Sequence, residues 1–139
     1  MRWRGQLERD GPPSLHLARA KGIKKMKELT TNSSKINSQR TRLADRRPSE
    51  TFSVECAGLT YLATVSQFPD GRLGEIFITS HKVGSAADTA ARDSAIACSI
   101  ALQFGADVEI IRKALCRDSA GNANGPLATA LDLIARGEK

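Results

Sequence analysis

Long apolar segments are absent from this 139-residue sequence. No run of about 18 apolar residues occurs, so we expect no membrane-spanning helix. The charged opening "MRWRGQLERD" is not followed by an apolar stretch, which argues against a secretory signal peptide. These absences exclude an integral membrane protein and favour a cytoplasmic one.

Cysteine and histidine are also scarce. Cys56, Cys98 and Cys116 are odd in number and widely spaced, and no Cys-x-x-Cys occurs, so we expect reduced thiols and no disulfide framework. His16 and His81 lie far apart and match no metal-ligand spacing, so we expect no metal site. Neither a nucleophile elbow nor a Ser-His-Asp arrangement is visible, and we assign no catalytic residue.

The basic charge is concentrated in the first third of the chain. Residues 1–50 hold 13 Lys and Arg against 5 Asp and Glu, whereas residues 51–139 hold 8 against 10, for a net charge of +6. Residues 1–47 are polar and poor in large apolar side chains, which predicts a disordered basic tail. This tail is either a solvated leader or an arm that binds nucleic acid through phosphates. Trp3 is its one aromatic residue, which favours the leader.

From Pro48 onward the sequence predicts strands. The stretches "ETFSVECAG", "LTYLATVSQF" and "LGEIFITS" alternate apolar and polar residues, with Phe52 and Val54 on one face of the first. The stretch "PDGR" predicts a tight turn in which Gly71 takes a positive φ. We therefore expect a three-stranded antiparallel meander over residues 51–79.

Three helices are expected after the strands. Residues 86–104 are small or apolar almost all round, "ADVEIIRKALC" has Asp107 as its N-cap, and "GPLATALDLIARG" has Pro126 at its start and Gly137 at its end. Strands followed by helices predict an α+β domain, here over residues 48–137, with the helices packed on one face of the sheet.

The junction before the first expected helix is the candidate binding site. Lys82, Gly84 and Ser85 precede the helix, whose first N–H groups carry partial positive charge, so together they are a candidate phosphate or carboxylate contact. The alternative is that Gly84 makes the turn, Ser85 caps the helix and Lys82 is solvated. The small side chains of residues 86–104 also suit close approach to a second subunit, which predicts a possible homo-oligomer.

The run "TYLATVSQFPDGRLGEIFITSHKVGSAADTAARDSAIACSIALQFGADVEIIRKAL" resembles the TSCPD domain, found near the C-terminus of adenosylcobalamin-dependent (class II) ribonucleotide reductases and also in short stand-alone proteins. The family takes its name from a Thr-Ser-Cys-Pro-Asp stretch that opens the last helix. Here Pro126 is kept, but Gly125 and Leu127 stand where the Cys and Asp would be, so the resemblance transfers no role of that cysteine.

The resemblance implies an accessory or nucleotide-binding module linked to deoxyribonucleotide synthesis, with a nucleotide or a reductase subunit as partner. It implies adenosylcobalamin in the full-length reductases but no cofactor in this chain. A catalytic barrel needs about 250 residues or more, so we do not expect this chain to reduce a nucleotide by itself. The alternatives are an oligomerisation module acting through residues 86–104, and nucleic-acid binding through the basic tail.

Overall fold

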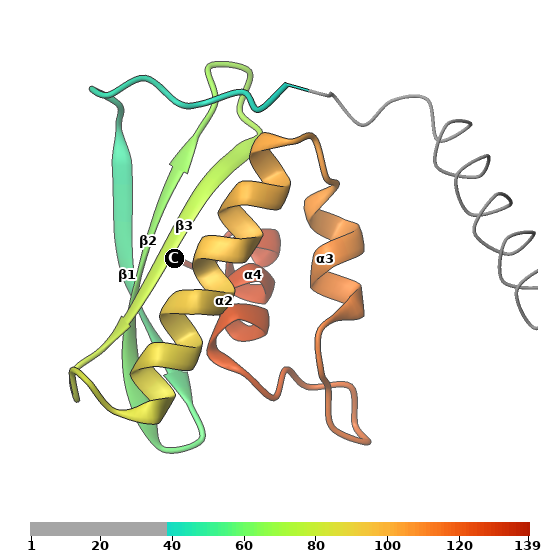
Figure 1. The fold of residues 1–139 in the computed structure, drawn as a ribbon. Helices are drawn as coiled ribbons and strands as arrows, with labels where there is room; N and C mark the ends of the chain where they lie inside the picture. Colours follow the sequence, from blue (N-terminus) through green and yellow to red (C-terminus); the bar gives the residue numbers. More distant parts are fainter. Residues whose placement is uncertain (1–38) are drawn as a thin grey trace, which may run out of the picture. The chain divides into compact units, whose positions relative to one another are not determined.

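A three-stranded antiparallel sheet followed by three helices makes up the part of the chain that the computed structural model describes, residues 39–139 (Figure 1). The strand order is β1-β2-β3, as expected for a meander. This confirms the predicted fold class. The prediction of a disordered tail falls mostly on residues 1–38, which lie outside the described part. The elements are β1 (Ser49–Cys56), β2 (Leu59–Gln67), β3 (Leu73–Ser80), α2 (Ala86–Gln103), α3 (Val108–Ala114) and α4 (Pro126–Arg136).

One face of the sheet forms the core, as the alternation of apolar residues predicts. Register pairs Val54 with Tyr61 and Ala63 with Ile78, and all four side chains are buried. The other face is polar and exposed over most of β1, where Thr51 exchanges a hydrogen bond with a neighbouring threonine of β2. The core face needs cover from other elements, whereas the opposite face leaves Leu62 of β2 and Phe77 of β3 37% and 44% exposed.

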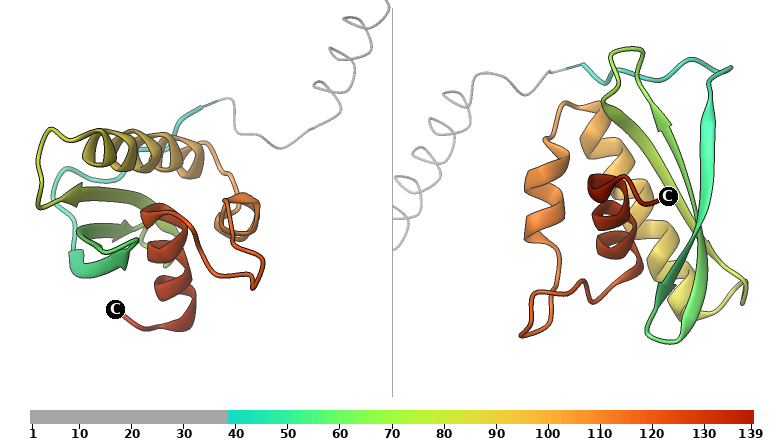
Figure 2. Two further views of the ribbon diagram at one scale, coloured as in Figure 1. Left: turned by 90° about the horizontal axis from the view of Figure 1, so that it is seen from below. Right: turned by 180° about the vertical axis from the view of Figure 1, so that it is seen from behind.

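The helices supply that cover. Helix α2 packs along β3, and α4 packs against β1 and against α2. Figure 2 shows from two further sides that α3 lies farthest from the sheet, where it contacts α4. The sequence signals for the helix ends are confirmed: Asp107 caps α3, Pro126 begins α4 and Gly137 ends it in the left-handed conformation. Within residues 39–139, no helix is long and apolar enough to cross a membrane.

Polar side chains of α2 cover the outer edge of β3. Ser99 Oγ accepts a hydrogen bond from Ile76 N at 2.9 Å and donates one to Ile76 O at 2.8 Å. Gln103 Nε2 donates to Gly74 O at 3.1 Å. An edge strand normally leaves its N–H and C=O groups open to pairing with another chain. Here α2 approaches closely enough to bind them, and the buried residues one and two turns before Ser99 are the small Ala95 and Ala91.

Residues 40–47, hereafter the strap, cross the end of the sheet at which β3 begins (Figure 1). Thr41 N donates to Gln103 O at 2.9 Å, which fixes the strap to the end of α2. Arg47 Nε donates to Glu75 Oε2 at 2.9 Å, which fixes it to β3. The predicted domain begins at residue 48, so these contacts tie the preceding residues to it.

The strap also packs on Gly74, and this contact leads to a testable prediction. A Cβ at Gly74 would lie 2.8 Å from the Phe68 ring and 2.9 Å from Leu43 Cδ1, both too close. We expect Gly74→Ala to lower the free energy of unfolding by about 1–3 kcal/mol, as overpacked cores do. Urea unfolding measures the loss.

A second substitution separates this overlap from other effects of a new methyl group. In the Leu43→Ala background, Gly74→Ala should cost less than it does alone, because one of the two overlapping side chains is gone. An equal cost in both backgrounds would show that Leu43 does not pack on Gly74.

Candidate functional site

The β3–α2 junction folds as a tight turn that begins a helix. Gly84 has φ +79°, which only glycine adopts freely. Ser85 is the N-cap of α2: its Oγ accepts a hydrogen bond from Asp88 N at 3.1 Å. The structure thus confirms the helix-start interpretation of the junction, which does not itself exclude an anion contact.

A side chain of the protein already occupies the backbone donors of this turn. Asp88 is only 2% exposed, and its two carboxylate oxygens accept hydrogen bonds from Ser80 N at 2.8 Å and Gly84 N at 3.2 Å. The hydrogen bond from Ser80 N–H, and to a smaller extent the one from Gly84 N–H, lowers the pKa of Asp88. Burial acts in the opposite direction but is outweighed. An incoming anion would have to compete with this carboxylate for the Gly84 N–H group.

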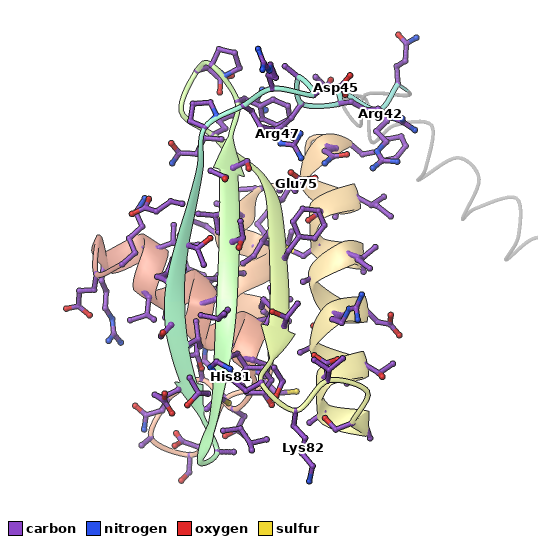
Figure 3. All side chains as sticks on the ribbon, turned by 90° about the vertical axis from the view of Figure 1, so that its left-hand side faces the viewer. Arg42, Asp45, Arg47, Glu75, His81 and Lys82 are labelled. Atoms are coloured by element: carbon purple, nitrogen blue, oxygen red, sulfur yellow. The ribbon has the colours of Figure 1, made fainter. Side chains whose placement is uncertain are left out.

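Lys82 stands apart from these donors. Its backbone N–H binds Ser80 Oγ at 3.2 Å, and its exposed side chain points away from the domain (Figure 3). The structure therefore places Lys82, Gly84 and Ser85 within one short turn. The Lys82 ammonium group, however, is not directed at the backbone N–H groups of Ser80 and Gly84. The anion contact there stays a prediction.

A pocket lies at the opposite end of the sheet, beneath the strap. It encloses about 660 Å³, and we call it the strap pocket. Figure 3 shows Arg42 and Arg47 at this end and Lys82 at the other. Sequence reasoning missed this site because "TRLADRR", residues 41–47, was assigned to the tail; the signal was a basic cluster directly before the first strand. Its lining residues are Thr41, Arg42, Leu43, Ala44, Arg46, Arg47, Pro48, Ser49, Glu50, Val65, Gln67, Phe68, Pro69 and Lys139.

A buried carboxylate on α4, that of Asp132, is the centre of a further cluster of polar side chains. Asp132 accepts two hydrogen bonds from Arg117, both at 2.8 Å, and one from Arg112 Nη1 at 2.9 Å. These bonds, chiefly those from Arg117, hold the pKa of Asp132 far below its ordinary value despite burial. Arg112 also binds Glu109, and Arg117 donates to the carbonyls of Gly121 and Arg112. The cluster joins α3, α4 and the loop between them, which is a structural task.

The start of α4, where the family motif would lie, borders a smaller apolar pocket of about 330 Å³. Cys116, Gly125 and Pro126 line it, together with small side chains of α2 such as Ala90. Cys116 is exposed and not in a disulfide. Among residues 39–139, no three His, Cys, Asp or Glu side chains gather in a way that could hold a metal ion.

The three thiols differ in access, which predicts their order of reaction. Burial raises the pKa of Cys98 to about 11, so it is protonated at neutral pH. Cys56 is half-buried and donates to Asn124 O at 3.6 Å, whereas Cys116 is exposed. In the full chain at pH 8, we expect a disulfide reagent to modify Cys116 first and Cys98 only on unfolding.

Absorbance of the released thiolate follows this reaction. Cys116→Ser should abolish the fast phase and leave the slower ones unchanged. Modification of Cys98 in the folded protein at the rate of Cys116 would contradict the burial described.

These features define a small α+β domain with cationic side chains at both ends of its sheet. A family model described as the TSCPD domain matches residues 23–137, and the chain belongs to this family. The match confirms the resemblance noted from the sequence. It begins well before Pro48, so it includes the strap.

The curated relatives that the chain matches are much longer than the chain, and they share one name. The chain is similar to a vitamin B12-dependent ribonucleotide reductase of Agrobacterium fabrum, with 36% identity over 74 residues, 53% of this chain and 6% of the relative. The protein of the same name from Rhodopirellula baltica is 41% identical over 73 residues, which are 52% of this chain and 7% of the relative. The one from Bradyrhizobium diazoefficiens is 37% identical over 71 residues, which are 51% of this chain and 6% of the relative. The chain thus spans only a small fraction of their length. No solved structure matches it.

Proposed function

We propose that this chain is an accessory module that binds a nucleotide or a related anion and serves deoxyribonucleotide synthesis. The observation that carries the proposal is the family match over residues 23–137, together with relatives named vitamin B12-dependent ribonucleotide reductase. The cationic side chains at the two ends of the sheet support the anion-binding part. A reductase subunit is the protein partner that this function implies, and the cytoplasm is the compartment.

The proposal does not make this chain a complete reductase. Its described residues form one small sheet and three helices, whereas the catalytic barrel implied by the resemblance needs about 250 residues or more. We accordingly assign adenosylcobalamin to the full-length reductases and no cofactor to this chain. Incubation of the chain with adenosylcobalamin, a dithiol and a nucleoside diphosphate should give no deoxynucleotide.

Thermal unfolding tests the binding part. A ligand that binds only the folded state raises the unfolding midpoint by mass action. We expect at least one of dATP, ADP and GDP, at millimolar concentration, to raise the midpoint of the full chain by several degrees. No shift with any nucleotide or with phosphate would overturn the binding part while leaving the reductase link open.

Two cationic sites are candidates for this binding. The first is the predicted contact at Lys82, Gly84 and Ser85, where an anion would use the mobile ammonium group and compete with Asp88. The second is the strap pocket. Lys82→Ala distinguishes them, because it removes the ammonium group from the first site and leaves the second intact.

A second candidate function is assembly through α2. Ile96 and Ile100 lie one turn apart on this helix and are 44% and 39% exposed, as an unpartnered contact face would be. Sedimentation of the full chain at two concentrations tests this function. Mass that rises with concentration, and returns to that of a monomer in Ile96→Glu/Ile100→Glu, would favour it over a nucleotide-binding monomer.

Nucleic-acid binding is the remaining alternative, and it depends on the basic excess of residues 1–50. Its signature would be affinity that falls steeply with salt, since binding to phosphates releases counterions. A weak salt dependence would exclude it.

A further inference from the structure

We propose that the strap pocket is the nucleotide site, and that it binds a nucleoside phosphate with the base and sugar against its apolar wall and the phosphates against the strap. This inference rests on the proposed function and deepens it. Nothing in the family match or in the names of the relatives assigns a ligand to this part of the domain.

The dimensions of the pocket suit a small molecule. Its volume of about 660 Å³ falls within the 300–1,000 Å³ typical of small-molecule sites. Three separate parts of the chain enclose it: the strap together with the start of β1, the end of β2 with the following turn, and Lys139. Such a concave site suits a compact ligand better than an extended polymer.

The wall of the pocket is largely apolar. Val65, Pro48 and Pro69 line it, and the buried Phe68 lies in the turn beside them. The guanidinium carbon of Arg72 sits 5.1 Å from the centre of the Phe68 ring, so a side chain of the protein already covers this ring. The apolar wall offers contact area to the base and sugar of a ligand, and inorganic phosphate alone would leave that area unused.

The rim of the pocket carries excess positive charge. Arg42 and Arg46 are exposed, and neither has a hydrogen-bond or ion-pair partner among residues 39–139. Their guanidinium groups are therefore open to a ligand, and guanidinium suits phosphate because it donates two parallel hydrogen bonds.

The other charged groups of the rim are already paired. Arg47 is held by Glu75, and Lys139 Nζ lies 2.6 Å from Glu50 Oε2. Asp45 is exposed on the strap but does not line the pocket. Among the described residues, the lining thus contains two arginines without a partner and no carboxylate without a partner. This excess of positive charge favours an anionic ligand.

The strap's own contacts hold the backbone segment that carries these arginines. Thr41 is fixed to α2, and Leu43 packs on Gly74. Arg47 Nη1 also donates to Ala44 O at 2.9 Å, which closes the bend over residues 44–47 that carries Arg46. A pre-formed arrangement of this kind lowers the cost of ordering that ligand binding must overcome.

Titration of the ¹⁵N-labelled full chain by NMR tests the inference, with ADP, adenosine and inorganic phosphate as separate ligands. ADP should shift the amide signals of Val65, Gln67 and Phe68, and bind more tightly than adenosine or phosphate alone. Arg42→Ala/Arg46→Ala should weaken ADP binding by about 10-fold or more, since hydrogen bonds to charged groups are lost. Both side chains are exposed, so this variant should fold normally.

Matched variants decide between the outcomes. Lys113→Ala/Arg136→Ala removes the same charge from exposed positions of α3 and α4 and should leave ADP binding within about twofold. Unchanged ADP binding in Arg42→Ala/Arg46→Ala would overturn the inference. If ADP binding were instead lost in Lys82→Ala, the nucleotide would be placed at the β3–α2 junction, and the proposed function would be preserved. Absence of ADP binding to the unmodified chain would overturn the inference. If the other nucleotides also failed to bind, the proposed binding function would be overturned as well.

Discussion

Replacement of Asp132 by alanine is expected to lower the free energy of unfolding by about 3 kcal/mol, the lower end of the cost of breaking a buried ion pair. Asp132 is 8% exposed and binds both Arg112 and Arg117. Without it, two guanidinium groups would face each other with no carboxylate between them. The lower end applies because these arginine side chains are still 24% and 23% exposed, which lets water screen them.

Urea unfolding of the full chain measures this loss. Asp93→Ala is the matched control, because it removes an exposed helical carboxylate and should change the free energy of unfolding by less than about 0.5 kcal/mol. If Asp132→Ala cost no more than the control, the cluster would not stabilise the fold.

The pH dependence of stability gives an independent test of the same cluster. The pKa of Asp132 is lowered in the folded state, so as pH falls the unfolded chain, whose Asp pKa is about 3.9, takes up the proton first. The stabilisation is therefore present above about pH 4 and is lost progressively below it. The difference in unfolding midpoint between the natural chain and Asp132→Asn should shrink from pH 5 to pH 2, whereas a constant difference would contradict this account.

Asp88→Ala is expected to have the second large effect and to lower the unfolding midpoint by roughly 10 °C. The substitution leaves Ser80 N–H and Gly84 N–H without their acceptor, and it removes the carboxylate that ties β3 to the start of α2. Calorimetry measures the midpoint, and hydrogen exchange should show faster exchange at these two amides.

Arg92→Ala is the control for Asp88→Ala. Arg92 Nη1 lies 3.9 Å from Asp88 Oδ2, and its side chain is 56% exposed, so its removal should lower the midpoint by a degree or two at most. Equal effects of the two substitutions would show that the ion pair on the helix surface, and not the backbone contacts, is what stabilises the junction.

The strands and helix ends were predictable because their causes are local. Alternating apolar residues gave the buried face that includes Val54 and Tyr61, and Gly71 in the turn has the expected positive φ of 89°. The helix signals at Asp107 and Pro126 are likewise read within a few residues. Each of these features depends on neighbours in the sequence.

The polar contacts were harder to predict because their partners are distant or belong to the backbone. Asp88 forms an ion pair with Arg92, four residues on, but no spacing pattern shows that the same carboxylate also accepts hydrogen bonds from the backbone N–H groups of Ser80 and Gly84. Arg112 and Arg117 meet Asp132 across separations of 20 and 15 residues, which no local pattern encodes. The strap was missed for the same reason, since its contacts lie on β3 and at the end of α2.

The most direct test of the central claim is calorimetric titration of the full chain with ADP at physiological and at raised salt. The account predicts one saturable site per chain that persists at 0.3 M salt, because the site combines an apolar wall with the two arginines of its rim. No saturable heat with ADP, or heat from several sites that vanishes at 0.3 M salt, would contradict the claim and leave only non-specific attraction to a basic chain.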